Sequence, residues 1–290
     1  MINQPIYRVL TNGKILVDYG PITMTIEASL RSVPFTAASI AGAESAVGLL
    51  KELSSCLEIA RRPVAELNPA EDIHYPKILR QMLSSVRLMG EPDFTPMAAV
   101  AGSIADLVKE TAVDAGADRV VVNNGGDISI HLSPGSTPLR IGIISDLQEG
   151  KVTHTLTLFP EQGIGGIATS GLGGRSLTKG VASAVAVLSK NSGIADAAAT
   201  SIANATNCED PSVERCLAQE MDHLTDIRGH LVTLRVGRLN ADSMESALSK
   251  GLKRAGQLFR QKLVEGAVVF VQGQVRTMPL FLASHLKKIV

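Results

Sequence analysis

The side chains best suited to chemistry lie in one stretch, residues 163–207, which is rich first in glycine and then in alanine. Thr169 and Ser170 place two hydroxyls among six glycines, and glycine lets a backbone approach a ligand closely. Further along, Asp196, Thr200 and Asn204 follow one another at intervals of four residues in a segment of high helix propensity. This spacing predicts that a carboxylate, a hydroxyl and an amide share one face of a helix.

Two interpretations of this polar stripe stay open from the residues alone. In the first, the stripe is structural: the Thr200 hydroxyl bonds back to the Asp196 carbonyl, Asp196 favours the helix N-terminus, and Asn204 is exposed. In the second, Asp196 and Thr200 are hard oxygen ligands for Mg²⁺ beside a glycine loop that holds phosphate. Magnesium commonly takes one or two protein groups together with substrate phosphates, so two ligands are not too few.

Four motifs in order carry a resemblance to a known family. They are PMAAVAG at 96–102, NGGDI at 124–128, ATSG at 168–171 and ADAAAT at 195–200. Together they resemble the ApbE family of flavin-handling proteins, and they are most similar to its functionally uncharacterised, cytoplasmic UPF-type branch. Each motif alone is weak evidence, whereas four in the same order across one region are fairly specific.

The resemblance implies a fold, a ligand and a metal. The fold would be α+β, ApbE-like and T-fold-related, with antiparallel sheets covered by helices. The ligand would be FAD or another flavin nucleotide, contacted by Asn124, Gly125, Gly126, Asp127, Thr169, Ser170 and Gly171. A Mg²⁺ ion would be bound by Asp196, by Thr200 and by the backbone carbonyl of Ala98, four residues before Gly102.

The chain departs from the family after the TSG motif. FMN-transferring members carry a longer insert there, with a histidine and an Asp-Pro-x-Thr-Gly turn, and residues 172–180 contain neither. Ala101 also replaces the lysine that family members carry before the helix glycine. The short loop can still contact phosphate through its N–H groups, Arg175 and Lys179.

Two functions therefore stay open, and the sequence assigns no catalytic residue. The first is FAD pyrophosphatase activity or transfer of an FMN or nucleotidyl group. The second is a catalytically silent binding or accessory protein, which relatives in the same branch suggest is linked to sulfur assimilation.

Composition limits the remaining possibilities. A length of 290 residues predicts one ApbE-like domain over 1–290, or two intimately packed α+β halves. Lys+Arg and Asp+Glu are both 28, so no net charge favours nucleic acid or an anionic membrane. The N-terminal residues lack an apolar signal segment, and the three cysteines are scattered. We expect a cytoplasmic protein whose partner is a small-molecule nucleotide, with no membrane or nucleic-acid partner, and a homo-oligomer stays open.

Periodicity and turn residues predict the elements that position these side chains. Asn12-Gly13 predicts a hairpin of strands 6–10 and 14–18. Further strands are expected at 22–27, 119–123, 128–132, 139–145, 152–159, 181–188, 231–236, 268–271 and 275–282. Helices are expected at 37–62, 76–89, 97–115, from Asn191-Ser192 onward, at 211–221 and at 242–263. Because no βαβ unit surrounds Gly163-x-Gly165-x-x-Ala168, we do not interpret that pattern as a dinucleotide-binding fingerprint.

Overall fold

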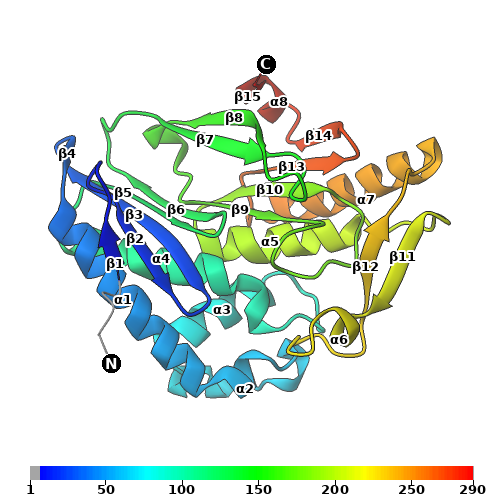
Figure 1. The fold of residues 1–290 in the computed structure, drawn as a ribbon, viewed down its shortest axis with the longest axis horizontal. Helices are drawn as coiled ribbons and strands as arrows, with labels where there is room; N and C mark the ends of the chain where they lie inside the picture. Colours follow the sequence, from blue (N-terminus) through cyan, green and yellow to red (C-terminus); the bar gives the residue numbers. More distant parts are fainter. Residues whose placement is uncertain (1–6, 290) are drawn as a thin grey trace.

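The computed structural model describes residues 7–289 and confirms the predicted α+β fold (Figure 1). Every strand pair within that range is antiparallel. The largest sheet has ten strands in the order β1-β2-β3-β5-β6-β9-β10-β13-β14, and β4 pairs with β3. Two smaller sheets have the orders β15-β8-β7 and β11-β12.

The strands of the main sheet are β1 (Tyr7–Val9), β2 (Ile15–Tyr19), β3 (Ile22–Leu30), β4 (Val33–Pro34), β5 (Arg119–Asn124), β6 (Asp127–Leu132), β9 (Gly166–Ser170), β10 (Ala184–Ser189), β13 (Gly266–Val271) and β14 (Gln274–Met278). Those of the smaller sheets are β7 (Leu139–Ile144), β8 (Val152–Leu158), β15 (Leu286–Lys288), β11 (Val213–Leu217) and β12 (Leu231–Val236).

The α-helices are α1 (Thr36–Ser55), α2 (Leu57–Ala60), α3 (Lys77–Arg87), α4 (Val100–Asp114), α5 (Ser192–Ala205), α6 (Ala218–Met221), α7 (Ala241–Arg260) and α8 (Leu282–His285). Short 3₁₀ turns occupy Val64–Glu66, Pro69–His74, Pro96–Ala99 and Pro160–Gln162. Among the residues that the structure describes, no helix has both the length and the apolar character that crossing a bilayer requires.

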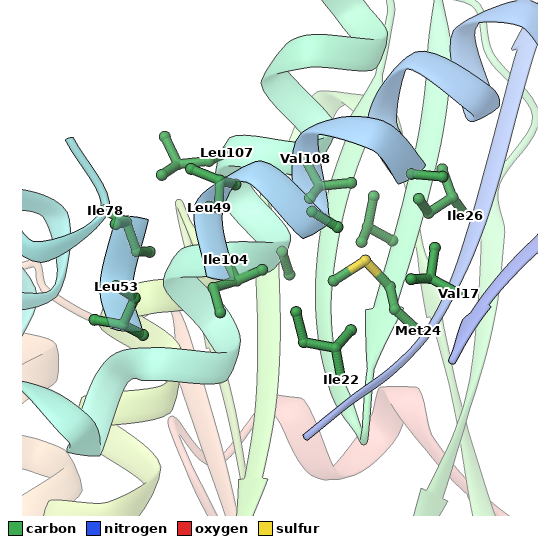
Figure 2. Close-up of a cluster of buried hydrophobic side chains, with 14 of the residues drawn as sticks. Val17, Ile22, Met24, Ile26, Leu49, Leu53, Ile78, Ile104, Leu107 and Val108 are labelled. Atoms are coloured by element: carbon green, nitrogen blue, oxygen red, sulfur yellow. The ribbon is translucent and has the colours of Figure 1, made fainter. Parts of the chain in front are cut away.

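Helices cover one face of the main sheet, and the β15-β8-β7 sheet covers part of the other. α1, α3 and α4 pack on the N-terminal strands around a cluster that includes Met24, Ile26 and Val108, and Figure 2 shows these side chains pointing toward one another. α5 and α7 pack on β9, β10 and β13 in a second cluster. β7 and β8 close a third cluster on the opposite face of β10 and β13.

The central strand β10 is buried on both faces, which explains its unbroken apolar sequence. Val185 and Val187 face the helices α5 and α7, whereas Ala184, Ala186 and Leu188 face the β7–β8 hairpin. Alternate residues of a strand point to opposite faces, so both sets of side chains leave water. The strand expected at 181–188 is thus present, with bounds shifted to Ala184–Ser189.

The expected helix at 37–62 is wrong in its continuity. It stops at Ser55 and resumes as α2, because Cys56 leaves the helical conformation at φ −123° and its N–H bonds to the Leu53 carbonyl. The break allows Cys56 and Ala60 to join the first core cluster. Within the first expected strand, Ile6 lies outside the described residues, and β1 covers Tyr7–Val9.

Two expectations near the C-terminus are also wrong. Residues 211–221 form β11 followed by the four-residue helix α6, because β12 supplies a pairing partner that local propensity does not reveal. The expected strand 275–282 ends at Met278, since Pro279 has no N–H to donate to a ladder. The helix expected at 242–263 is present as α7, and Asn240 caps it, since its side chain accepts from the Ser243 N–H at 2.8 Å.

Candidate functional site

The NGGD motif forms the tight turn between β5 and β6. Asn124 pairs with Asp127 across the ladder, and Gly125 and Gly126 between them adopt φ values of +69° and +111°. A type I′ turn requires positive φ at both central positions, which glycine adopts without strain. The Asn123 side chain accepts from the Gly126 N–H at 2.9 Å, so the turn is held in one shape.

Asn124 and Asp127 tie this turn to its neighbours. The Asn124 side-chain amide donates to the Ala101 carbonyl of α4 at 3.1 Å. Asp127 Oδ1 accepts from the Thr169 N–H of β9 at 3.3 Å, which links the NGGD and TSG motifs directly. The family resemblance implies a turn at TSG, but Thr169 and Ser170 instead end the strand β9, and the chain turns after them.

Asp196 lies on α5 and accepts a hydrogen bond from the start of α4. Gly102 is the third residue of α4, so its N–H has no partner inside that helix, and it donates to Asp196 Oδ2 at 3.0 Å. In return, the α4 residue Asp106 accepts from the N–H groups of Ser192 and Gly193 at 3.1 and 2.9 Å. Each helix thus places a carboxylate at the N-terminus of the other, where the helix dipole favours negative charge.

Gly102 makes this reciprocal arrangement possible. A Cβ at this position would lie 2.2 Å from the Ser192 carbonyl oxygen and 2.9 Å from Asp196 Cβ. The two helix backbones therefore touch at Gly102, and the glycine inside the helix reflects close packing. This contact brings the Asp196 carboxylate to the end of α4 where Ala98 lies.

The polar stripe on α5 is not arranged as the structural interpretation expects. The Thr200 hydroxyl makes no hydrogen bond to the Asp196 carbonyl or to any other group in 7–289, although only 9% of the residue is exposed. Asn204 is half-buried and accepts two hydrogen bonds. All three residues of the stripe line one cavity.

Burial raises the pKa of both carboxylates at this cavity, and the charge of one acts on the other. Burial raises the pKa of Asp127 from 3.8 to about 7, although the Thr169 N–H and the Arg175 charge oppose the rise. Burial and then the charge of Asp127 raise the pKa of Asp196 well above its usual value, against the N–H groups of Gly102 and Ala101. Neither carboxylate forms an ion pair with a basic side chain in the part of the chain described. The pair would bind a cation favourably.

The loop at residues 172–180 closes the cavity beside the NGGD turn. The Arg175 guanidinium lies against Gly125 and donates weakly to the Pro21 carbonyl at 3.4 Å. Lys179 is already paired, because its ammonium lies 2.6 Å from the Asp93 carboxylate. Although burial acts in the other direction, Lys179 holds the pKa of Asp93 below its ordinary value. Of the two basic residues expected to contact phosphate, Arg175 is the one available.

The cavity has a volume of about 1220 Å³ and is lined by residues from all four family motifs. Nine of the ten predicted site residues line it: Ala98, Asn124, Gly125, Gly126, Asp127, Thr169, Ser170, Asp196 and Thr200. Gly171 does not line it, because at φ +143° it packs against the backbone of residues 182–184. That these residues bind a nucleotide or a metal stays a prediction. No group of three His, Cys, Asp or Glu residues able to hold a metal occurs among those described.

Sequence reasoning missed several residues that line the same cavity. Asp93, Arg140 and Asp226 come from three segments without a recognisable motif. Asp226 accepts a hydrogen bond from Thr95, and this bond fastens the loop before β12 across the cavity. Contacts over more than a hundred residues of sequence leave no periodic signal, so the pattern alone does not predict them.

The antiparallel sheets and the four motif segments around one cavity define an ApbE-like protein. A family model described as "AbpE bacteria" matches residues 7–277, so the chain belongs to that family. The solved apo structure of the Pseudomonas stutzeri flavinyl transferase ApbE has a TM-score of 0.52 and 13% identity, covering 97% of this chain and 99% of its own. The solved structure of an ApbE protein from Thermotoga maritima has a TM-score of 0.51 and 12% identity, covering 96% of this chain and 99% of its own. At such identities the likeness establishes the fold alone.

Relatives with higher identity carry names that state no activity. A UPF0280 protein of Methanosarcina barkeri is 37% identical over 158 residues, which are 54% of this chain and 59% of the relative. A UPF0280 protein of Methanothrix thermoacetophila is 42% identical over 124 residues, or 42% of this chain and 50% of the relative. The matches thus span between half and three fifths of these relatives' lengths.

Proposed function

We propose that the cavity binds a flavin nucleotide such as FAD together with Mg²⁺. The observation that carries this proposal is the meeting of Asp127 and Asp196 at one cavity, with no basic side chain paired to either among residues 7–289. Burial raises the pKa of both carboxylates and the charge of Asp127 raises that of Asp196 further, so a divalent cation would stabilise their charged forms. The cavity volume of about 1220 Å³ exceeds that of most small-ligand pockets, as a dinucleotide needs.

The oxygen atoms around Asp196 suit magnesium. Asp196 has a second oxygen beyond the one that accepts from Gly102, and the Thr200 hydroxyl has no hydrogen bond within the described range. With the Ala98 carbonyl they make a set of hard oxygen donors, which Mg²⁺ prefers to nitrogen or sulfur. When bound, the ion would neutralise charge on a pyrophosphate and make its phosphorus easier to attack.

The protein's own groups would orient the nucleotide. Arg175 and the Gly125 N–H of the NGGD turn would bind phosphate oxygens, since the Gly126 N–H is already held by Asn123. Aliphatic side chains from β3, α1 and the 3₁₀ turn before α4 would cover the ring; they include Ile22, Leu53 and Met97. Asp127 accepts from the Thr169 N–H through Oδ1, which leaves Oδ2 as the oxygen that would face the cation or the nucleotide.

The reaction we propose is cleavage of the FAD pyrophosphate, with water or a second substrate taking the released group. We expect FAD to bind in a Mg²⁺-dependent manner, as measured by flavin fluorescence, and to yield FMN and AMP when water is the acceptor. Asp196→Asn keeps an oxygen for the Gly102 N–H but loses the charge, so it should fold and bind FAD at least about tenfold more weakly. Thr200→Val should behave similarly, and Thr200→Ser should retain binding.

Two results would refute the proposal. One is wild-type protein that shows no saturable FAD binding with Mg²⁺. The other is an Asp196→Asn variant with the same affinity and Mg²⁺ dependence as the wild type, since Asp196 would then be only a helix cap.

A second function, nucleotide binding without turnover, is favoured by two observations. The loop at residues 172–180 carries neither a histidine nor an aspartate. Among the described residues that line the cavity there is no histidine. A protein of this kind would bind the nucleotide as an accessory module without turning it over. Chromatography of FAD after long incubation separates the two functions, because an accessory protein returns the FAD intact.

A further inference from the structure

The amide of Asn204 is held in one orientation by two donors from the 172–180 loop. The backbone N–H of Lys179 lies 2.9 Å from Asn204 Oδ1, and the Thr178 hydroxyl lies 3.2 Å from the same atom. A backbone N–H only donates, so the atom facing it must be the amide oxygen rather than the nitrogen. The –NH₂ group of Asn204 consequently points away from this loop.

That –NH₂ group has no acceptor in the described part of the protein. No hydrogen bond from Asn204 Nδ2 to another residue is present, and the residue is half-buried and lines the cavity. An amide whose oxygen already accepts two hydrogen bonds, on a residue that lines a ligand cavity, can present its nitrogen as a donor to a ligand.

The position of Asn204 shows which part of a ligand it would meet. It follows Asp196 by eight residues on α5, so at 1.5 Å per residue it lies about 12 Å further along the helix. Thr200 occupies the turn between them. A nucleotide whose phosphate lies at Asp196 and Thr200 would extend toward Asn204 with its ribose and its ring.

The charges around Asn204 argue against an anionic group at this end. The ammonium of Lys179 is neutralised by Asp93 at 2.6 Å, and His230 Nδ1 lies 3.8 Å from the same carboxylate. Asp222 and Asp226 also line the cavity on the loop before β12. Because Lys179, whose N–H contacts the Asn204 amide, already pairs with Asp93, an anion here would meet a carboxylate and a cation that is engaged, whereas an uncharged acceptor would not be repelled.

We infer that Asn204 is a specificity residue whose Nδ2 donates a hydrogen bond to an uncharged acceptor, a ring nitrogen or ring carbonyl, on the base of a bound nucleotide. The inference rests on the proposed function for the position of the phosphate. Both halves of FAD offer such an acceptor, the carbonyls of the flavin and the ring nitrogens of adenine. The test must therefore distinguish them.

Asn204→Asp is the most direct variant. The aspartate keeps an oxygen for Lys179 and Thr178 and replaces the donor with an acceptor of nearly the same size. Asn204→Ala is its uncharged companion, and thermal unfolding checks that both variants fold. Affinities for FAD, riboflavin and AMP are measured with Mg²⁺. Riboflavin carries no charge, so a weaker affinity for it does not arise from repulsion.

We expect both variants to bind FAD about tenfold more weakly and to lose affinity for either riboflavin or AMP, but not for both. A loss for riboflavin places the flavin ring at Asn204, and a loss for AMP places adenine there. Unchanged affinities overturn the inference. Equal losses for riboflavin and AMP also overturn it, because they indicate a general disturbance of the cavity.

A measurement on the wild type separates this inference from the proposed function. In protein labelled with ¹⁵N-asparagine, the Asn204 side-chain amide is identified by its absence from the Asn204→Asp spectrum. Rapid exchange of its protons with water is expected without ligand, and protected protons would reveal a protein acceptor and overturn the inference. If the wild type fails to bind FAD, the proposed function falls, and the exchange result alone decides whether Asn204 presents a free donor.

Discussion

Replacing Gly102 with alanine tests the helix contact that positions Asp196. The new Cβ would lie 2.2 Å from the Ser192 carbonyl oxygen, about 1 Å inside the closest distance at which such atoms normally rest. The clashing atom belongs to the α5 backbone, so no side-chain rotation relieves it and the two helices must separate. Overpacking of this kind costs about 1–3 kcal/mol or more, against about 1 kcal/mol that alanine gains over glycine in a helix. Because the 2.2 Å contact is with backbone, the cost lies at the upper end of that range or above it, and we expect a net loss of at least about 2 kcal/mol in the free energy of unfolding.

Gly48 supplies a matched control on α1. It is an exposed glycine inside a helix, and a Cβ there would meet nothing within 4 Å. Gly48→Ala should therefore raise the free energy of unfolding by up to about 1 kcal/mol, through helix propensity alone. Urea denaturation followed by circular dichroism measures both variants.

Glycine-to-alanine substitution should thus lower the free energy of unfolding at position 102 and raise it at position 48. Because Gly102 also donates to Asp196, we expect Gly102→Ala to weaken FAD binding, while Gly48→Ala leaves it unchanged. The reasoning is refuted if Gly102→Ala is as stable as the wild type, since α4 and α5 would then not be in contact through their backbones.

Two further predictions concern buried polar groups. Asp127→Asn keeps an acceptor for the Thr169 N–H. In the wild type the pKa of Asp127 rises from 3.8 to about 7 on folding. The wild type therefore loses stability as pH rises from about 4 to about 7, because the folded state holds its proton longer, and the variant has no such loss. In chelator, the variant's advantage should grow between pH 4 and pH 8 by about 1–2 kcal/mol after screening by cavity water, and an advantage independent of pH would contradict the assigned pKa. Thr206→Val should lower stability by about 2–4 kcal/mol, because the fully buried Thr206 hydroxyl accepts from the N–H groups of Val181 and Ala182, both at 3.0 Å. Thr206→Ser should retain most of that stability in thermal unfolding, and equal losses in the two variants would show that the methyl group matters instead.

Local rules were enough to predict much of the fold. An Asn-Gly turn indicated the β1–β2 hairpin and an Asn-Gly-Gly turn the β5–β6 hairpin, because only certain residues adopt positive φ without strain. The helix expected from Asn191-Ser192 onward is α5, and the Asn191 side chain caps it by accepting from the Ile194 N–H at 2.8 Å. The unbroken apolar run before it indicated a buried strand, which is β10. Each of these features depends on residues that are near neighbours in the chain.

The expectations that failed depend on partners elsewhere in the chain. β9 was not expected, because a glycine-rich segment has low strand propensity and its ladder is supplied by β10 and β6. β11 was expected as a helix for a similar reason, since β12 decides its conformation. The break at Cys56 follows from the packing of α2 into the core.

The sequence by itself determined the types of chemical group and their order along the chain: a turn with a carboxylate, a glycine-rich segment with two hydroxyls, and a helix with aspartate and threonine on one face. Only the tertiary structure decided their surroundings. It showed that Asp196 also caps α4, that Lys179 is neutralised by Asp93, and that the Asn204 amide faces the cavity. Charge, burial and hydrogen-bond direction arise from atoms brought together across many residues of chain, and no local pattern records which atoms those will be.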